Sequence, residues 1–233
     1  MARNGSAHAT LKQGTLGRRS LDEDIAEQLR AAILRGDLAQ GERLTELGLA
    51  DHWQVSQGTI RAALKTLQYE GLVETLPRRG TFVAQITEED VLEIYTLRDS
   101  LEALASRLAA ERRDAAGHKA LTGILAQMRH AVAAGKRQQM LELDFRFHRT
   151  VVDMSGHKRL AEIYGTIEAQ TKLFLSMTDQ FHHDLDGLLA IHEPLAEAIL
   201  TGDAERAFAL ASHHSQKDGT ELVAVLFAKD PAP

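Results

Sequence analysis

Four polar residues in the second half of the chain fall where a helical pattern expects buried side chains. Asp144 and His148 stand four residues apart, on the same side as the apolar residues of their segment. His192 and His214 interrupt two later apolar stripes in the same way. His213, the neighbour of His214, is turned about 100° away, which favours His214 as the inward residue.

One carboxylate and three imidazoles on inward faces suit a divalent transition metal. Neutral imidazole and carboxylate are ligands of zinc, and four of them leave room for water or substrate. Burial of such groups without partners costs free energy, and a shared cation removes that cost. Each residue taken singly could instead be a hydrogen-bonded core residue. Because four such groups fall on three segments, we predict a metal site, with zinc as first choice and nickel, manganese or iron as alternatives.

Arg98 occupies a core position of an earlier helical pattern. The apolar residues of its stripe are Val91, Ile94, Leu101, Ala105 and Leu108. One interpretation is a local ion pair with Glu102, which lies four residues further along. The other is a bidentate clamp for a bound carboxylate, because the planar guanidinium matches a carboxylate in geometry. The spacing favours neither interpretation over the other.

The segment from 44 to 83 has the pattern of a DNA-binding domain. A short helical pattern begins near Leu47 and stops at Gln54, and Ser56 can cap a second helix. Amide, hydroxyl and guanidinium groups at the exposed N-terminal end of that helix suit the major groove of DNA. Its buried stripe is Ile60, Ala63, Leu64 and Leu67, and its exposed face carries Gln57, Thr59, Arg61, Lys65 and Gln68.

A basic hairpin is predicted after the second helix. Residues 72–75 and 81–83 are predicted as two short strands, joined by a tight turn over 77–80. Two amphipathic helices and a hairpin occur in many domains, so the periodicity alone leaves DNA binding open. The basic tip with Arg79 favours it, because a basic loop beside a polar helix face can contact phosphates. The combination predicts a winged helix-turn-helix.

The chain divides into three predicted regions. Residues 1–19 form a flexible N-terminal arm without apolar periodicity. Residues 20–85 form the winged helix-turn-helix domain, and a capping box at Ser20 begins its first helix. Residues 86–229 are predicted to form an all-helical domain that contains the predicted metal site, and its later helices are expected over 117–134, 136–154, 158–180, 184–201 and 203–228. The family resemblance given below makes this domain the effector-binding one as well. The predicted fold class is therefore mainly α, a winged helix followed by an all-α bundle.

The composition restricts the class of protein. The 233 residues include no cysteine, so disulfides and thiolate metal sites are excluded, and a reducing cytosol is compatible. No apolar run approaches the roughly 18 residues of a membrane span, so we expect a cytoplasmic protein without a membrane partner. The net charge is −6, with the acidic excess in the C-terminal part, which argues only against non-specific nucleic-acid binding.

Two sets of residues together match the pattern of a known family. Those in the N-terminal part are Gly36, Asp37, Leu38, Gly41, Leu44, Leu49, Ala50, Val55, Ser56, Arg61, Ala63, Leu64, Leu67, Glu70, Gly71, Leu72, Val73, Arg79 and Gly80. Those in the C-terminal part are Arg98, Leu101, Glu102, Asp144, Phe147, His148, Ser155, Gly156, His192 and His214. With them the chain resembles, over about residues 20–228, a GntR-family transcriptional regulator of the FadR subfamily, with an FCD ligand-binding domain.

The resemblance implies a homodimeric repressor, not an enzyme, that binds an inverted-repeat operator in double-stranded DNA. It also implies that a small organic acid, bound near the metal, alters operator affinity. By resemblance the metal ligands are Asp144, His148, His192 and His214, and the effector-binding residues are Arg98 and Glu102. By resemblance the DNA-binding residues are Ser56, Gln57, Gly58, Thr59 and Arg61 in the recognition helix and Arg79 and Gly80 in the wing.

Three residues of the winged helix depart from the family pattern. Gln57 stands where arginine is usual, and Thr59 stands where proline is frequent. Glutamine prefers adenine where arginine prefers guanine, so we predict a half-site that differs from the family's common one at that position. Gln54 stands where glycine is frequent, and we expect it to need a left-handed backbone at modest cost.

The sequence therefore predicts a metal-containing, ligand-responsive transcriptional regulator. Two alternatives stay open. One is a metal-dependent hydrolase or lyase that uses the bundle site with Glu102 as its base. The other is a metal-sensing regulator, in which the metal alone changes operator binding.

Overall fold

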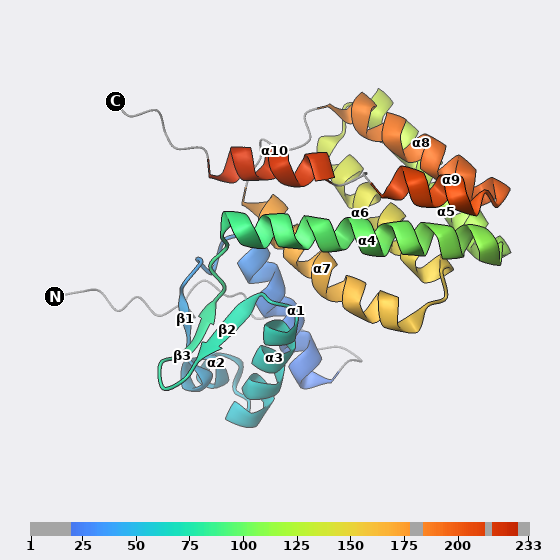
Figure 1. Cartoon of the computed structure of the whole chain (residues 1–233). Coiled ribbons are helices and arrows are strands. Elements are labelled where there is room, and N and C mark those ends of the chain that lie inside the picture. Colours follow the sequence, from blue (N-terminus) through green and yellow to red (C-terminus); the bar gives the residue numbers. More distant parts are fainter. Residues whose placement is uncertain (1–19, 178–183, 213–215, 228–233) are drawn as a thin grey trace, which may run out of the picture. The chain divides into compact units, whose positions relative to one another are not determined.

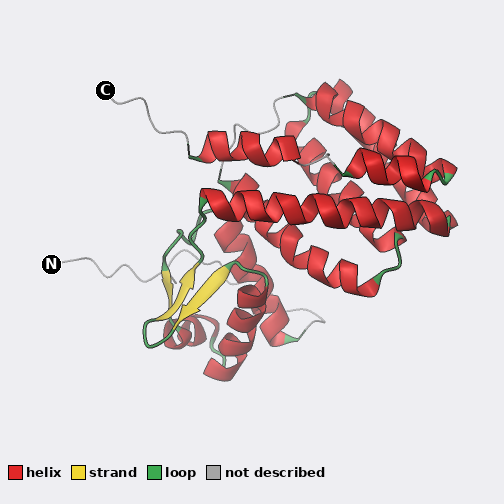
Figure 2. Cartoon of the chain, in the orientation of Figure 1, coloured by secondary structure: helices red, strands yellow, loops and turns green. Residues whose placement is uncertain are grey.

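The described part of the chain folds mainly into helices and a small antiparallel sheet (Figures 1 and 2), as the predicted fold class requires. The structure is a computed structural model that describes residues 20–177, 184–212 and 216–227. The chain divides into two compact units, Met1–Thr87 with Ala169–Asp179 and Glu88–Glu168 with Gln180–Pro233. They are called the N-terminal unit and the C-terminal unit below.

The N-terminal unit contains the predicted winged helix-turn-helix. Its elements before residue 88 are α1 (Leu21–Leu34), β1 (Arg43–Leu44), α2 (Glu46–Trp53), α3 (Gln57–Tyr69), β2 (Val73–Leu76) and β3 (Gly80–Val83). The antiparallel strands are ordered β1-β3-β2. The predicted hairpin is β2 and β3, and Leu76 pairs with Gly80 beside the turn. The sequence did not predict β1, because a strand of two residues is too short to show a period.

Local signals in the sequence begin the helices of this unit. The backbone N–H of Ser20 donates to the Glu23 carboxylate at 3.0 Å, as the capping box predicts. Ser56 caps α3, since its hydroxyl accepts a hydrogen bond from the Thr59 backbone N–H at 3.1 Å. These caps satisfy N–H groups that have no partner inside the helix, so both helices begin where the sequence predicts.

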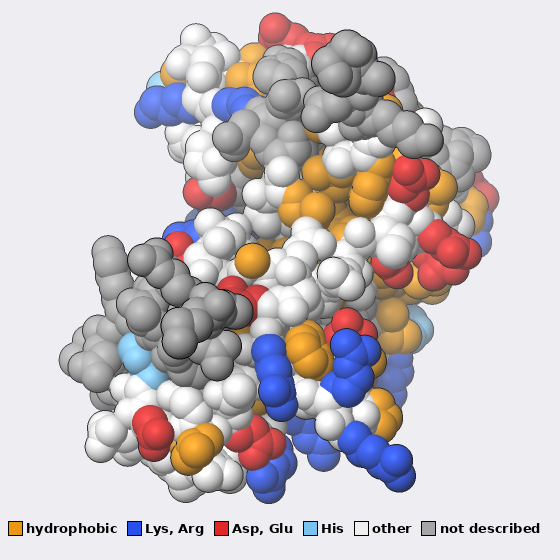
Figure 3. Space-filling model, turned by 90° about the vertical axis from the view of Figure 1, so that its left-hand side faces the viewer, with side chains coloured by type: hydrophobic (Ala, Val, Ile, Leu, Met, Phe, Trp, Pro, Cys, Tyr) orange, Lys and Arg blue, Asp and Glu red, His pale blue; other side chains and the backbone are white. Residues whose placement is uncertain are grey.

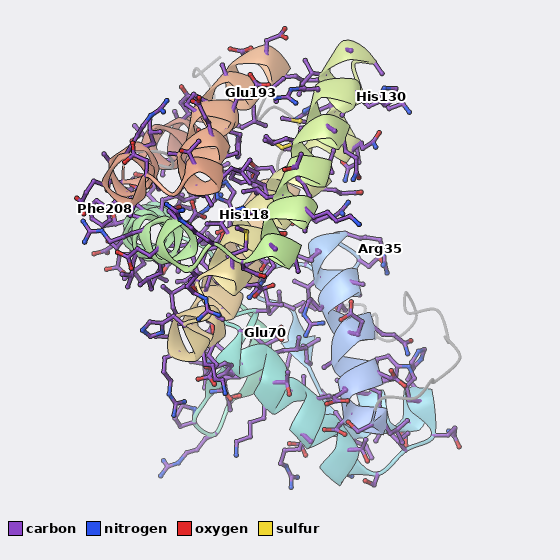
Figure 4. The ribbon with its side chains drawn as sticks, turned by 90° about the vertical axis from the view of Figure 1, so that its right-hand side faces the viewer. Arg35, Glu70, His118, His130, Glu193 and Phe208 are labelled. Atoms are coloured by element: carbon purple, nitrogen blue, oxygen red, sulfur yellow. The ribbon has the colours of Figure 1, made fainter. Side chains whose placement is uncertain are left out.

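Apolar side chains from the helices and the sheet form the core of this unit. A half-buried ion pair lies beside this core. Arg30 of α1 donates from Nε and Nη2 to the Glu70 carboxylate at 2.8 and 2.6 Å. Glu70 lies at the end of α3 (Figure 4), so this pair fastens α3 to α1. The buried apolar residues include Ile25, Leu29, Leu49, Ile60, Leu67, Leu72 and Val83.

The C-terminal unit is an all-helical bundle. Its helices are α4 (Glu88–Arg112), α5 (Ala115–Ala133), α6 (Arg137–Met154), α7 (Lys158–Ser176), α8 (Leu185–Thr201), α9 (Ala204–Ala211) and α10 (Gln216–Leu226), with α7 belonging to this unit only as far as Glu168. The long helix α4 packs against α6, α8, α9 and α10, and Figure 1 shows α9 and α10 beside it. The apolar core includes Ala109, Leu121, Met128, Phe147, Val151, Leu195 and Ile199.

Two contacts near the surface tie pairs of these helices together. Arg129 of α5 donates from Nε to Glu193 of α8 at 2.7 Å. The Arg107 guanidinium of α4 lies 4.3 Å from the ring centroid of Phe208 on α9. Figure 4 shows Glu193 and Phe208 on their helices.

The last predicted helix, over 203–228, is two helices in the structure. The first, α9, ends at Ala211, and α10 begins at Gln216. The Ser212 hydroxyl donates to the Phe208 carbonyl at 2.7 Å, a side-chain bond of the kind that competes with helical bonds. Residues 213–215, which include His214, lie outside the described residues. Among the helices described, none is long and apolar enough to span a membrane.

Candidate functional sites

Three of the four predicted metal ligands meet inside the C-terminal unit. Asp144, His148 and His192 each offer one ligand atom, and these atoms all lie within 4.8 Å of one another. Their exposed fractions are 4%, 2% and 0%. The fourth predicted ligand, His214, lies outside the described residues. The described part of the predicted set is therefore a compact, buried cluster.

Two helices supply the three residues. Asp144 and His148 share one face of α6 because they are four residues apart, and His192 reaches them from α8. Phe147, next to His148 in α6, packs edge-on against the His192 imidazole with ring centroids 4.7 Å apart. This aromatic contact restricts the orientation of His192 beside the carboxylate.

Hydrogen bonds settle which nitrogen of each imidazole faces the cluster. His192 Nδ1 lies 2.6 Å from the Leu188 carbonyl, and since a carbonyl only accepts, Nδ1 carries the hydrogen. His192 Nε2 then faces Asp144 Oδ1 at 2.9 Å. In the same way His148 Nδ1 donates to Glu102 Oε2 at 3.0 Å. His148 Nε2 is turned inward, 3.5 Å from Asp144 Oδ1 and 3.2 Å from His192 Nε2.

The cluster is electrostatically suited to hold a positive charge. Burial by itself would lower the pKa of His148, but the Glu102 and Asp144 carboxylates outweigh burial and raise that pKa to about 9. Burial likewise opposes ionisation of Asp144, yet His148 and His192 hold the pKa of that carboxyl well below its usual range. Two Nε2 atoms and a carboxylate oxygen would repel one another without a shared proton or cation.

The residues fit a metal ion on two further grounds. Two ligand atoms at about 2.0–2.1 Å from a tetrahedral metal are about 3.3 Å apart, and the three separations here are 2.9, 3.2 and 3.5 Å. In addition, the outer nitrogen of each histidine is held by a carbonyl or a carboxylate, the arrangement that orients metal-binding histidines. The types of the ligand atoms, the distances between them and the outer hydrogen bonds of the histidines therefore all fit a bound metal ion.

Arg98 and Glu102 form the local ion pair that their spacing allows. Arg98 Nε donates to Glu102 Oε1 at 2.6 Å, and both side chains are buried. The Arg98 guanidinium also approaches the cluster, with Nη2 3.9 Å from Asp144 Oδ2, beyond hydrogen-bond range. Arg98 thus lies between two carboxylates, and its Nη2 is on the side of Asp144, within the cluster of predicted ligands.

The two oxygens of Glu102 are engaged by protein groups. Oε1 accepts from Arg98 and also from the Tyr164 hydroxyl of α7 at 2.7 Å, while Oε2 accepts from His148. Glu102 therefore orients His148 and is itself held by two donors. The role of Tyr164 could not be predicted from the sequence, because nothing in its local pattern distinguishes it and its partner Glu102 lies 62 residues away.

The predicted DNA-reading residues of α3 lie at its exposed N-terminal end. Gln57, Gly58 and Arg61 are exposed, and Thr59 is partly buried beside the Ser56 cap. Arg61 donates from Nε and Nη2 to the Glu46 carboxylate of α2 at 2.9 and 2.6 Å. This pair is open to solvent and holds the guanidinium against the end of α2. Figure 3 shows several Lys and Arg side chains close together on the surface of the N-terminal unit.

The predicted wing is a tight turn with two left-handed residues. Arg78 has φ 62° and Gly80 has φ 112°, a backbone conformation that glycine adopts without strain. A Cβ on Gly80 would also meet Arg43 Nε of β1 at 3.2 Å. Arg79 is exposed, with its guanidinium 5.8 Å from the Phe82 ring centroid. Gly80 therefore shapes the turn, and Arg79 projects from it.

Gln54, between α2 and α3, has the left-handed backbone that we expected, with φ 55° and ψ 45°. Its side chain donates from Nε2 to the Asp51 carbonyl at 2.7 Å. We expect Gln54→Gly to raise the free energy of unfolding by about 0.5–1 kcal/mol, because relief of strain outweighs the extra chain entropy of glycine. Urea denaturation of both proteins measures this change.

The matched control for this prediction is Gln68→Gly. Gln68 lies in the right-handed helix α3 and is exposed, so glycine there should cost about 1 kcal/mol. Equal destabilisation by the two glycine variants would show that the turn at Gln54 carries no strain.

A winged helix joined to an all-helical unit with a buried polar cluster defines a DNA-binding protein with a second, helical domain. Comparison with protein families gives two matches. The family described as bacterial regulatory proteins, gntR family, matches residues 21–83, and the FCD domain family matches residues 93–217. The chain belongs to the GntR family and carries an FCD domain. It is a DNA-binding transcriptional regulator and not an enzyme, so the hydrolase or lyase alternative is set aside.

The chain is similar in sequence to curated relatives over most of their length. The chain is 27% identical over 199 residues to a protein of Paenarthrobacter nicotinovorans named "Probable D-xylose utilization operon transcriptional repressor", covering 85% of this chain and 87% of that protein. It is 29% identical over 212 residues to the gluconate operon transcriptional repressor of Bacillus licheniformis, covering 88% and 86%. The fold is similar to the solved structure of E. coli McbR/YncC, with TM-score 0.71, 21% identity and coverage of 90% and 98%.

Proposed function

We propose that this protein is a cytoplasmic repressor whose operator affinity is controlled by a small organic acid bound beside a metal ion in the C-terminal unit. The observation that carries the proposal is the buried cluster of Asp144, His148 and His192, approached by the Arg98 guanidinium. Relatives named as repressors of the D-xylose utilization and gluconate operons support control of a catabolic operon. The FCD architecture is consistent with the FadR subfamily.

The metal would be held by Asp144, His148 and His192, together with His214 as the proposed fourth ligand. Zinc is our first choice, and nickel, manganese and iron are alternatives, because all accept imidazole and carboxylate. A bound divalent cation would supply a fixed positive charge that attracts an anionic effector. Glu102 accepts the hydrogen of the outer nitrogen of His148, so the inward nitrogen is the one that would bind the metal, in place of the proton that it carries without metal.

Arg98 is the proposed carboxylate-binding residue of the effector site. Its Nε is committed to Glu102, so the guanidinium is held in one orientation. Its Nη2 lies on the side of Asp144, where the predicted metal site is. A guanidinium fixed in this way can bind a carboxylate in a defined geometry. We therefore expect metal and guanidinium to act on the same acid, with Glu102 as a positioning residue.

DNA recognition is proposed for the exposed end of α3 and for the wing. The proposed contacts are Ser56, Gln57, Gly58, Thr59, Arg61, Arg79 and Gly80, on an inverted-repeat operator bound by a homodimer. Gln57→Arg should change the preferred base at one position of each half-site from adenine to guanine, because these side chains make bidentate contacts to those bases. Selection from a random DNA library with each protein measures the change. A variant that keeps the wild-type base at every position would refute the assignment of Gln57.

The experiment that tests the effector proposal starts from the purified full chain. Elemental analysis reports the metal, and mass spectrometry under native conditions reports any retained acid. Operator binding is then measured by fluorescence anisotropy with a panel of small carboxylates, using the metal-loaded protein. We expect one acid to change operator affinity by about 5- to 150-fold, the usual range of allosteric coupling. Absence of metal after reconstitution would refute the central claim.

Metal sensing is the second candidate, favoured by the same buried cluster. In that case metal alone would change operator affinity, and no acid would be needed. Removing the metal with a chelator and adding it back in the absence of any acid separates the two proposals.

A further inference from the structure

The Tyr95 hydroxyl is a buried polar group for which the described residues offer no hydrogen-bond partner. Tyr95 is 2% exposed and lies on α4, three residues before Arg98. A buried hydroxyl without a partner costs free energy, so native proteins seldom keep one without a purpose. Its position beside Arg98 connects it with the proposed effector site.

The aromatic ring of Tyr95 is held from two sides. The Arg98 guanidinium lies 5.6 Å from its centroid. On another side α10 packs so closely that a Cβ added to Gly219 would come within 2.8 Å of the Tyr95 Cβ. The side chain is therefore confined between α4 and α10.

The hydroxyl lies within electrostatic reach of the groups that line the site. Burial raises the pKa of Tyr95 above its usual range, and Arg98, Asp218, Asp144 and Glu102 all act on the same oxygen. The hydroxyl therefore stays protonated at neutral pH and can donate. A neutral O–H donor beside the guanidinium suits a neutral oxygen atom next to the carboxylate of a ligand.

We propose that Tyr95 is a specificity-determining residue, whose hydroxyl hydrogen-bonds an oxygen substituent next to the effector carboxylate and so selects hydroxy acids over plain carboxylic acids. This inference rests on the proposed effector function and adds the chemical class of the acid. Arg98 would bind the carboxylate of the acid, and the Tyr95 hydroxyl would donate a hydrogen bond to the neighbouring hydroxyl of the acid. A ligand that fills the unpaired buried donor gains a hydrogen bond that a plain carboxylic acid cannot make.

The test is calorimetric titration of the metal-loaded full chain with matched pairs of acids, malate with succinate and lactate with propionate. We expect the wild type to prefer the hydroxy acid of at least one pair. Tyr95→Phe should reduce that preference by about 3- to 10-fold, the size of one neutral hydrogen bond. Affinity for the plain acid and the metal content should stay unchanged. The matched control is Tyr69→Phe, because Tyr69 is exposed on α3 in the other unit.

A second measurement needs no ligand. Without acid, Tyr95→Phe should leave Tm unchanged or raise it, because the lost hydroxyl has no partner. Tyr164→Phe removes a hydroxyl that is bonded to Glu102, so it should lower Tm by about 2–6 °C. An equal decrease in both variants would overturn the proposal, since it would show that the Tyr95 hydroxyl is already satisfied.

The titration distinguishes failure of the proposed effector function from failure of the proposed role of Tyr95. If the wild type binds none of the acids, the effector function fails and the Tyr95 proposal fails with it. If the wild type binds the acids without preferring hydroxy acids, or if Tyr95→Phe keeps the full preference, only the Tyr95 proposal is overturned.

Discussion

Replacing Asp144 with asparagine is expected to weaken metal binding by at least about 100-fold, since loss of even an outer partner of a metal ligand costs about 10- to 100-fold. Asp144 is the residue that both inward nitrogens approach, His192 Nε2 at 2.9 Å and His148 Nε2 at 3.5 Å. Asparagine keeps the size of the side chain but removes its charge. Equilibrium competition with a chromophoric chelator measures the metal affinity of each protein. Elemental analysis after dialysis measures how much metal each protein retains.

The same substitution should remove most of the stabilisation that the metal provides. A ligand present at about 100 times its Kd stabilises the folded protein by about 2.7 kcal/mol. Wild-type protein should therefore show a metal-dependent rise in stability that Asp144→Asn lacks at the same metal concentration. Asp153→Asn is the matched control, because Asp153 lies on the same helix and is exposed. If Asp144→Asn kept wild-type metal affinity, the cluster would not be the metal site.

Replacing Arg98 with alanine is expected to lower the free energy of unfolding by about 3–5 kcal/mol, the cost of breaking a buried ion pair. Arg98 is buried between the Glu102 and Asp144 carboxylates, and its removal takes a full positive charge away from two buried anions that then share only His148. Urea denaturation of the full chain measures the change. Metal should reduce the loss, because a divalent cation stabilises the same carboxylates.

A matched variant isolates the effect of burial. Arg129→Ala also deletes an arginine that pairs with a glutamate, but the Arg129 and Glu193 side chains are 57% and 40% exposed. Exposed pairs contribute about 0–1 kcal/mol, so this variant should be nearly as stable as wild type. If Arg98→Ala and Arg129→Ala lost the same free energy of unfolding within about 1 kcal/mol, the role of Arg98 as an internal counter-charge would be contradicted.

Much of the winged helix followed from local sequence. Ser56 begins α3 because its hydroxyl satisfies the Thr59 N–H, a contact over three residues. The basic hairpin is likewise encoded by a turn between two short apolar segments. Features of longer range were missed. The Arg61–Glu46 pair joins side chains 15 residues apart, and no periodicity marks it.

The candidate site was predictable only in part. The spacing of Asp144 and His148 places both on one face of α6. That His192 joins them depends on how α8 packs on the bundle. Glu102 was predicted to bind effector or to pair with Arg98, and its hydrogen bond to His148 was not expected. Tyr95 and Tyr164 were missed, because their importance depends on partners, or on the absence of a partner among the described residues, in three dimensions.

The sequence by itself determined the class of this protein, a winged-helix regulator, and placed inward polar residues on separate helices. Helical periods, caps and turns arise from contacts between residues a few positions apart, so these features can be predicted from spacing. The tertiary structure decided which polar residues meet, which nitrogen of each histidine faces the cluster, and that Glu102 supports His148. These features depend on how apolar helix faces pack together, and spacing along the chain does not specify which faces meet.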